Sequence, residues 1–351
     1  MKRRCCARCF GDRLIETEYI PQLDPISQTC DYCGAEDVDC VEPDLLGQWF
    51  WALVATYQED STGRLLVDLF RDEWGMFEGS GMNSAQQKEL LDEVLDDGQV
   101  VRKAFVPISD DDGFGRLREW EDLRDEMMHH NRWFLDEPMD MDRVGWLLGQ
   151  LIAPVELVSG RVWYRARLMD GERVFRTEDM GAPPPRLAGH GRANPAGIPY
   201  LYLASTRTTA VAELRPHTGE HATVARFSLS GNEPTFADLR SPRQLASPLL
   251  GDEEEIIRLR SDLPLLQRLG EELTRPVQPQ GVPYEYIPTQ YLSEYIKKQG
   301  FAGLLYRSSV SSDDGFNLAL FDPSMAEAVD AVEVIVAEVS VKLTNQHEAT
   351  G

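Results

Sequence analysis

The sequence has no cysteine after position 40, although all six of its cysteines lie before that point. This distribution excludes a disulfide scaffold and favours a local metal site. No apolar run approaches the roughly 18 residues that a membrane span needs. The basic N-terminus has no apolar stretch behind it, which excludes a secretory signal. We therefore expect a cytoplasmic protein that does not contact a membrane.

Positive charge is also scarce, because the sequence has 35 Lys and Arg residues but 59 Asp and Glu residues, which gives a formal net charge of −24. Such a balance argues against nucleic-acid binding by the whole protein, but it leaves room for a small dinucleotide site. The sequence lacks the G-x-G-x-x-G turn of dehydrogenases and the G-x-x-x-x-G-K-[ST] loop of nucleotide hydrolases. Both of those nucleotide-binding classes are excluded.

The cysteines that are present form two C-x2-C pairs, Cys6 with Cys9 and Cys30 with Cys33, separated by 20 residues. Two such turns can point four thiolates at one ion, so the spacing predicts a structural zinc knuckle over residues 1–41. Gly34 suits the tight turn of a knuckle, and Cys5 is an alternative ligand to Cys6. The basic residues around the first pair leave a nucleic-acid-binding zinc ribbon as a second interpretation.

Residues 42–152 show helical spacing and no alternating strand pattern, which predicts a small helical bundle. The expected helices cover residues 45–57, 84–95, 114–135 and 141–151, with Ser84 as a candidate N-cap. From residue 153 the pattern changes to short apolar strands, expected at 162–166, 200–204, 223–229, 303–306 and 318–321. The chain is therefore predicted to be α+β, with a mixed α/β domain over 153–340 and a flexible tail over 341–351.

Two helices are expected among these strands, with a helical insertion near residues 252–273. The first begins after Ser205 or Thr206, runs to Glu213 and stops before Pro216. The second begins at Thr289 and ends at Lys298, before Gly300. Each of these two helices carries a short motif that also occurs in a known domain family.

Seven short motifs occur in order along this C-terminal part. They are Tyr164-Arg165, the glycine-rich segment 191–197 with Arg192, Tyr202-Leu-Ala, residues 209–213 ending in Glu213, Pro288-Thr-Gln290, residues 303–308 ending in Ser308, and residues 317–323 beginning with Asn317. In this order they resemble a RES domain, a relative of the ADP-ribosyltransferases. Arg307 stands where this family commonly has proline, so Ser309 remains an alternative to Ser308.

The resemblance implies an NAD-consuming toxin that cleaves the nicotinamide–ribose bond, with NAD as substrate and an Xre-type antitoxin or another regulatory protein as partner. Water, phosphate or a protein side chain would accept the ADP-ribosyl group, so a mono-ADP-ribosyltransferase remains an alternative. RES toxins are often dimers, which suggests a homo-oligomer. The segment around Arg124 and His129 resembles HEPN-like helical domains, so a HEPN-type ribonuclease is a third hypothesis.

The residue chemistry agrees with that reaction. Glu213 is the candidate for stabilising an oxocarbenium-like ribose, as carboxylates do in glycoside cleavage. Arg165 and Arg192 are candidates for gripping the pyrophosphate, although Arg165 could instead orient Glu213. Three further residues are candidates for the same site: Tyr202 stacks on the ring or bonds a ribose hydroxyl, Ser308 meets the ligand or holds Glu213, and Asn317 bonds the ligand or closes a turn.

Overall fold

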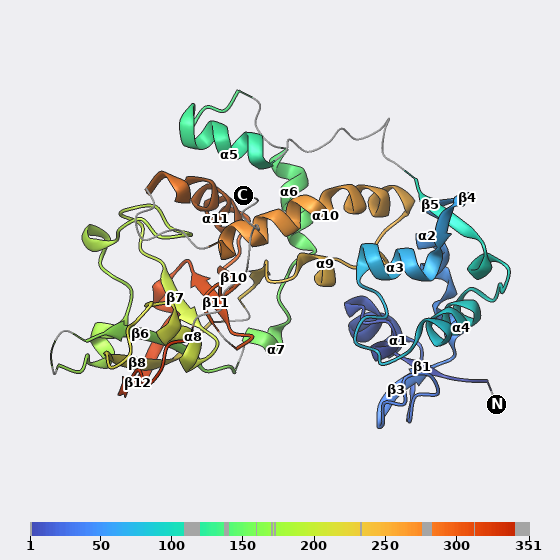
Figure 1. Cartoon of the computed structure of the whole chain (residues 1–351), viewed down its shortest axis with the longest axis horizontal. Coiled ribbons are helices and arrows are strands. Elements are labelled where there is room, and N and C mark those ends of the chain that lie inside the picture. The colour runs from blue at the N-terminus through green and yellow to red at the C-terminus, as the bar shows by residue number, and fades with distance from the viewer. Residues whose placement is uncertain are drawn as a thin grey trace, which may run out of the picture. The chain divides into compact units, whose positions relative to one another are not determined.

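The computed structural model describes residues 2–108, 120–136, 140–158, 160–169, 171, 173–231, 234–275, 283–311 and 313–340. The chain folds into two compact units (Figure 1). Unit 1 contains residues 1–152 and 241–270, and unit 2 contains residues 153–240 and 271–351. The α+β prediction is confirmed, since both units combine helices and strands.

Unit 1 begins with a three-stranded antiparallel sheet in the order β1-β3-β2, formed by Cys5–Cys6, Val38–Val41 and Ile26–Gln28. Its helices are α1 (Ile20–Gln22), α2 (Gly47–Ala55), α3 (Leu66–Trp74), α4 (Ser84–Leu95), α5 (Trp120–His129), α6 (Met141–Gly149), α9 (Pro242–Leu245) and most of α10 (Glu253–Thr274). The part of the expected 114–135 helix before Trp120 lies outside the described residues.

The prediction that residues 42–152 are wholly helical was wrong. β4 (Tyr57–Leu65) pairs antiparallel with β5 (Ala104–Pro107). The strand was missed because β4 is largely polar and exposed, so it carries no apolar alternation. The N-cap of α4 also differs: Asn83, not Ser84, accepts the Ala85 and Gln86 amides and completes a capping box with Gln86.

The segment 241–270 belongs to unit 1, although the sequence placed it inside the C-terminal domain. Its buried polar groups explain this assignment. The Asp262 carboxylate, only 2% exposed, accepts two 2.7 Å hydrogen bonds from the Arg143 guanidinium of α6. The Tyr19 hydroxyl donates to the Leu249 carbonyl at 2.7 Å. A buried carboxylate separated from its cation would be strongly destabilising, so this segment packs where its partners are.

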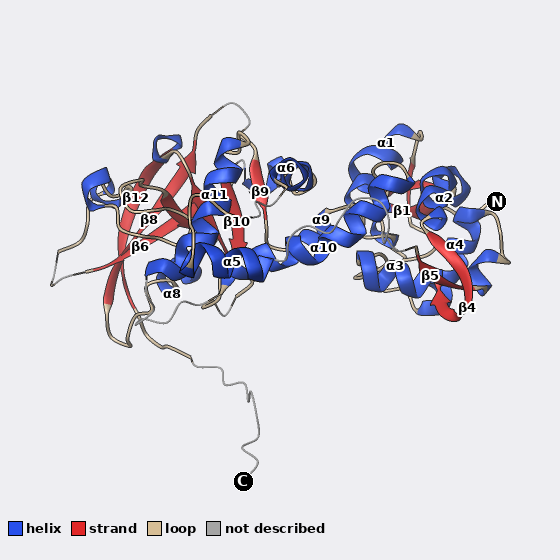
Figure 2. Ribbon diagram, turned by 90° about the horizontal axis from the view of Figure 1, so that it is seen from above, coloured by secondary structure: helices blue, strands red, loops and turns tan. Residues whose placement is uncertain are grey.

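Unit 2 is built on a seven-stranded sheet in the order β12-β8-β6-β7-β11-β10-β9 (Figure 2). The strands are β6 (Trp163–Leu168), β7 (Leu201–Ala204), β8 (His221–Leu229), β9 (Phe236–Asp238), β10 (Gly303–Arg307), β11 (Phe316–Leu320) and β12 (Ala326–Ile335). β9 and β12 were not predicted. β12 is a mostly exposed edge strand, so its pattern lacks a buried face.

The sheet of unit 2 is flanked by short helices. α7 (Val155–Val158) precedes β6, α8 (Arg207–Ala212) packs on β6, β7 and β8, and α11 (Ile287–Lys298) contacts β10. The main core gathers around Trp163, Leu203, Phe227 and Leu318, while a smaller cluster of Ala166, Ala204 and Val224 seats α8. No described helix is both long and apolar enough to span a membrane.

The buried Asp12 carboxylate should make the free energy of unfolding depend on pH. Asp12 is 7% exposed and accepts the Leu14 and Ile15 amides. Burial raises the pKa of Asp12 above its ordinary 3.8, despite opposing hydrogen bonds that include one from Ser247. Because the folded pKa exceeds the unfolded one, ionisation costs the native state free energy as pH rises above 3.8.

We therefore expect Asp12→Asn, which keeps the accepting oxygen, to melt above the wild type at pH 7. The difference should shrink as pH falls toward 3.8, where the unfolded aspartate also becomes protonated. Thermal unfolding between pH 4 and 8 measures this. The exposed Asp39→Asn serves as the control, because it makes the same charge change without burial. An Asp12→Asn variant less stable than wild type at pH 7 would contradict the assignment.

Candidate active site and metal centre

Glu213 lies at the C-terminal end of α8, and two side chains from distant parts of the chain hold one of its oxygens. The Ser308 hydroxyl donates to Glu213 Oε1 at 2.8 Å, and the Asn317 amide donates to the same atom at 2.6 Å. Asn317 is 4% exposed on β11, whereas Glu213 itself is exposed. Among the described residues, none donates to Glu213 Oε2. Oε1 is therefore fixed by Ser308 and Asn317, and Oε2 is available to a ligand.

The local sequence explains why α8 presents Glu213 in this way. Thr206 is the N-cap, as one of the two predicted alternatives, and its hydroxyl accepts the Thr209 amide at 3.0 Å. Ala210 packs into the small cluster on the sheet, with Val211 and Leu214 against it. The helix cannot continue, because Arg215 has a φ of +50° and Pro216 follows. Glu213 thus stands on the last turn of a short, well-seated helix.

The hydrogen bonds distinguish the two candidate serines, Ser308 and Ser309. Ser308 follows β10 and bonds Glu213, and its oxygen also accepts the Ser311 and Val310 amides at 3.2 and 3.3 Å. The Ser309 hydroxyl is buried and has no hydrogen-bond partner in the described part of the chain. Geometry therefore favours Ser308 as the residue that supports Glu213.

The glycine-rich loop that carries Arg192 is held from several sides. Tyr202 on β7 donates from its hydroxyl to Asn194 Oδ1 at 2.8 Å and accepts the Ala193 amide at 3.0 Å. Gln290 of α11 donates to the Gly191 and Asn194 carbonyls at 2.9 and 3.0 Å. The Tyr202 hydroxyl is thus committed to the loop, which differs from the expected bond to a ribose hydroxyl.

Thr289 also differs from its expected role. It lies inside α11, which begins two residues earlier with Tyr286 as its N-cap, and its hydroxyl donates to the Arg192 carbonyl at 2.6 Å. Buried threonine and glutamine side chains at 289 and 290 therefore anchor the loop to this helix. The residue that ends α11 behaves as predicted, because Gly300 has a φ of +93°.

Gly191 leaves no room for a side chain. A Cβ built on it would lie 2.2 Å from Asn194 Oδ1 and 2.7 Å from the Tyr202 hydroxyl, the two atoms that bond one another. We expect Gly191→Ala to break this bond and to destabilise unit 2 by about 1–3 kcal/mol, the usual cost of overpacking. Thermal unfolding measures this against Gly189→Ala, because a Cβ at position 189 meets no atom within 4 Å. Equal melting temperatures of the two variants would refute the prediction.

Arg192 lies close to a further tyrosine, Tyr306. The Arg192 guanidinium is 5.9 Å from the centroid of the Tyr306 ring and donates to the Leu273 carbonyl. Burial raises the pKa of Tyr306, the charge of Arg192 lowers it, and the charge of Glu213 raises it further. Tyr306 is 5% exposed and pairs with Asn317 across β10 and β11. Tyr306 belongs to the motif that ends in Ser308, but no local signal in the sequence distinguishes its side chain from that of an ordinary core tyrosine.

Arg165 lies where β6 and β7 part. These strands pair only at Tyr164 and Ala204, and Arg165 Nη1 donates to the Tyr202 carbonyl at 3.2 Å. Burial, with help from the charge of Arg167, lowers the pKa of Arg165 to about 10, which still leaves it cationic at neutral pH. Within the described ranges no carboxylate, Glu213 included, contacts the Arg165 guanidinium. The alternative role of Arg165 in orienting Glu213 therefore has no support.

A model of the RES domain matches residues 162–343, just over half of the chain. The chain belongs to the RES-domain family. The chain also resembles a chain in the crystal structure of the M. tuberculosis MbcT-MbcA toxin-antitoxin complex, with 13% identity and a TM-score of 0.31. That alignment covers 56% of this chain and 94% of the other. No curated protein matches the chain. The family resemblance drawn from the seven motifs is confirmed.

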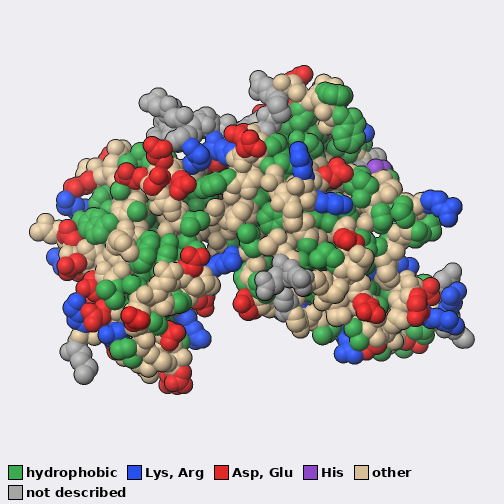
Figure 3. All heavy atoms as spheres, turned by 180° about the vertical axis from the view of Figure 1, so that it is seen from behind, with side chains coloured by type: hydrophobic (Ala, Val, Ile, Leu, Met, Phe, Trp, Pro, Cys, Tyr) green, Lys and Arg blue, Asp and Glu red, His purple; other side chains and the backbone are tan. Residues whose placement is uncertain are grey.

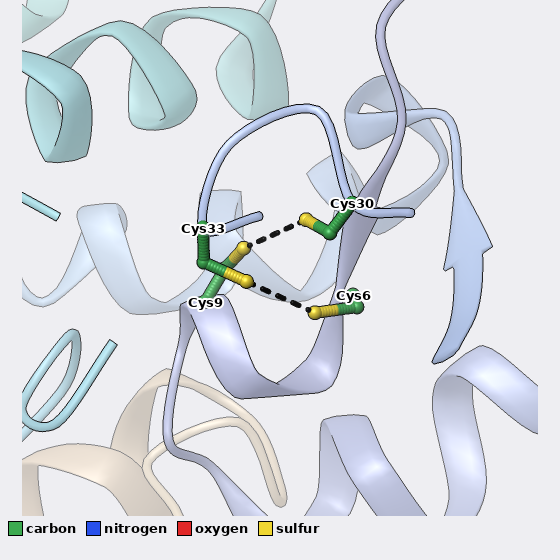
Figure 4. A group of neighbouring side chains, drawn as sticks. All are labelled: Cys6, Cys9, Cys30 and Cys33. Carbon is green, nitrogen blue, oxygen red and sulfur yellow. Dashed lines mark hydrogen bonds between the residues drawn. The ribbon is translucent and has the colours of Figure 1, made fainter. Parts of the chain in front are cut away.

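Outside the RES domain, Cys6, Cys9, Cys30 and Cys33 form a second candidate site, with all four sulfurs within 4.8 Å of one another (Figure 4). The Cys6–Cys33 and Cys9–Cys30 sulfurs are 3.5 and 3.4 Å apart, and all four thiols are free. Four thiolates about 2.3 Å from a tetrahedral ion would lie about 3.8 Å apart, so the arrangement fits a metal. The cluster could therefore hold a metal ion.

The turns around this cluster behave as the spacing predicts. Gly34 has a φ of +74° and donates its amide to the Cys30 carbonyl at 3.1 Å, which closes the second knuckle. Cys5 and Cys40 are fully buried but are not members of the group. Cys5 is the neighbour of Cys6 on β1, and successive strand residues point to opposite faces, so it cannot replace Cys6 without a register shift.

The Arg124–His129 pair lies on α5. The His129 ring is 4.0 Å from the Asp125 carboxylate, and the His130 ring is 3.6 Å from it. Five residues advance an α-helix by about 500°, so Arg124 and His129 project about 140° apart. On the face shown in Figure 3, acidic and basic side chains are interspersed. The HEPN-like role of this segment stays a prediction.

Proposed function

We propose that this RES-domain protein cleaves the nicotinamide–ribose bond of NAD. The observation that carries the proposal is the Glu213 carboxylate, with Oε1 held by Ser308 and Asn317 and Oε2 available to a ligand. A carboxylate fixed in this way suits a reaction in which positive charge develops on a sugar ring. Membership of the RES-domain family supports the same substrate.

The chemistry requires little from the protein beyond charge and position. The carbon–nitrogen bond breaks with its electron pair going to the pyridinium nitrogen, so nicotinamide leaves as a neutral molecule and needs no general acid. The ribose becomes oxocarbenium-like, and Glu213 Oε2 accepts a hydrogen bond from the adjacent ribose hydroxyl and stabilises that cation. Ser308 and Asn317 keep the carboxylate oriented during this step.

Two arginines of the RES domain, Arg165 and Arg192, suit the two phosphates of NAD. Arg165 is half-buried without a carboxylate partner in the described part of the chain, and charges shielded from water are normally paired, which favours an anionic ligand. Arg192 uses one nitrogen on the Leu273 carbonyl and retains other donors for phosphate oxygens. Tyr202 acts as a positioning residue, because its hydroxyl holds the loop that carries Arg192.

The consequence in the cell would be loss of NAD and arrest of growth, as expected of a toxin or a phage-defence effector. Such an activity needs restraint, so we propose that an antitoxin or another regulatory protein binds the chain. Family membership supports this partner class.

The four-cysteine cluster is proposed to bind structural zinc. Four thiolate ligands leave no open coordination position, and this is the usual composition of a structural rather than a catalytic zinc site. The cluster joins β1 to the turn at Cys30–Cys33, two segments that are also linked by reciprocal hydrogen bonds between Arg4 and Asp31. Zinc would thereby stabilise the N-terminal part of unit 1 and take no part in NAD cleavage.

The decisive experiment incubates the purified full chain with NAD, with and without phosphate, and resolves the products by chromatography and mass spectrometry. We expect release of nicotinamide in both conditions. Free ADP-ribose, a phosphorylated ADP-ribose, or protein gaining the mass of ADP-ribose would identify water, phosphate or a side chain as the acceptor. NAD that remains intact in every condition would refute the proposed function.

A further inference from the structure

The loop between β10 and β11 is fastened to the first turn of α8, the helix that carries Glu213. Asp313 is the fastening residue. Its Oδ2 accepts the Thr206 hydroxyl at 2.9 Å, and its Oδ1 accepts the Thr209 hydroxyl at 3.0 Å. It also accepts the Ser311 hydroxyl and, at 3.2 Å, the Gly315 amide. One carboxylate thus joins two segments that are about 100 residues apart in the sequence.

The fit around this carboxylate is close. A Cβ at Gly315 would lie 1.8 Å from the Thr209 hydroxyl oxygen, so the loop can approach the helix only with glycine there. Thr209 is fully buried, and the Phe316 amide donates to the Ser205 hydroxyl at 2.9 Å just beyond the contact. Partial burial raises the pKa of Asp313, but the Ser311, Thr206 and Thr209 hydroxyls outweigh it and hold that pKa below its usual value.

The same loop sets the position of Ser308. The Ser308 oxygen accepts the Val310 and Ser311 amides, so its hydroxyl proton is directed to Glu213. Ser311 in turn is bonded to Asp313 and lies 3.0 Å from the Thr209 hydroxyl. Asn317, in contrast, sits on β11 and reaches Glu213 without the loop. Only one of the two bonds to Glu213 depends on this fastening.

We propose that Asp313 is a positioning residue that fixes Ser308 against Glu213 by tying the β10–β11 loop to the N-terminal turn of α8. The effect of Asp313 on turnover rests on the proposed cleavage of NAD. Its effect on the position of the β10–β11 loop does not depend on that activity. Misplacing a group in an active site by about 1 Å can lower the rate about 100-fold, so a residue that fixes the position of Ser308 should have a large effect on turnover.

The test compares Asp313→Ala, Asp313→Asn and Asp314→Asn. Asn keeps one accepting oxygen and should rescue part of the loss, and Asp314→Asn removes the same charge from the exposed neighbouring residue. In steady-state nicotinamide release we expect kcat to fall about 30-fold for Asp313→Ala and about fivefold for Asp313→Asn, with KM within about twofold. Asp314→Asn should match the wild type.

Coupling to Ser308 distinguishes positioning from general destabilisation. Since Asp313 acts through Ser308, the Asp313→Ala/Ser308→Ala double variant should be no slower than Ser308→Ala alone. Additive losses would overturn the proposal. If Asp313→Ala does not fold, Ser311→Ala removes one bond to the carboxylate from the loop side, and the same non-additivity with Ser308→Ala is expected.

Hydrogen exchange tests the fastening even if the protein does not cleave NAD. The Val310 and Ser311 amides should exchange at least about tenfold faster in Asp313→Ala than in Asp314→Asn, because their acceptor, Ser308, is released. Unchanged exchange in Asp313→Ala would overturn the inference whatever the activity. Faster exchange with a catalytically silent wild type would instead refute the proposed function and leave the fastening intact.

Discussion

Glu213→Gln should lower kcat for nicotinamide release by at least about 1,000-fold, the scale of losing a charge aimed at a transition state, or about 4 kcal/mol. Glutamine retains an oxygen that can accept Ser308 and Asn317, so the fold should be unchanged. It removes the negative charge that opposes the developing ribose cation. Product formation under single-turnover conditions measures the loss directly.

Two matched controls sharpen this result. Glu327→Gln makes the same change on the exposed face of β12 and should retain wild-type activity. Ser308→Ala should lose about 30-fold or more, while Ser309→Ala, one residue away, should lose less than about twofold, because of the two serines Ser308 alone donates to Glu213. Nicotinamide release by Glu213→Gln within tenfold of the wild type would contradict the role assigned to the carboxylate.

Cys9→Ser should lose the bound metal and unfold the N-terminal part of unit 1. Cys9 is fully buried and its sulfur lies 3.4 Å from that of Cys30, so it is central to the cluster. Structural zinc contributes about 10–16 kcal/mol in small domains, which is as much as the whole stability of many proteins. We expect about one zinc per wild-type chain by elemental analysis and less than about half for Cys9→Ser.

A buried cysteine outside the cluster provides the control. Cys40→Ala should retain zinc and resist limited proteolysis of residues 1–41, since Cys40 is equally buried but is not one of the four. Chelation of the wild type should reproduce the proteolytic sensitivity of Cys9→Ser, and added zinc should reverse it. Wild-type protein that contains less than about half a zinc per chain would contradict the proposed metal.

The sequence alone was sufficient for the features that rest on short spacing. The two C-x2-C pairs predicted a group that the structure brings together, and the ordered motifs predicted a family membership that is confirmed. Helices with clear caps, such as α8 after Thr206 and α11 before Gly300, were also predictable. These are local signals, because neighbours within a few residues determine the turn or cap.

Features that depend on partners far along the chain were not predictable. The exposed β4 and the edge strand β12 carry no alternating apolar pattern, and the segment 241–270 joins unit 1 through partners such as Arg143. The choice of Ser308 over Ser309 and the commitment of the Tyr202 hydroxyl to the loop are likewise tertiary results. The roles of the site residues in catalysis stay predictions.

The sequence by itself determined that Glu213 would end a short helix and that four cysteines would meet. Only the tertiary structure decided that Ser308 and Asn317 share one oxygen of Glu213, and that Asp313 ties the serine loop to the same helix. The physical reason is that a hydrogen bond selects its partner by distance and direction. Both are set by how strands about 100 residues away are brought together, and no local pattern records that.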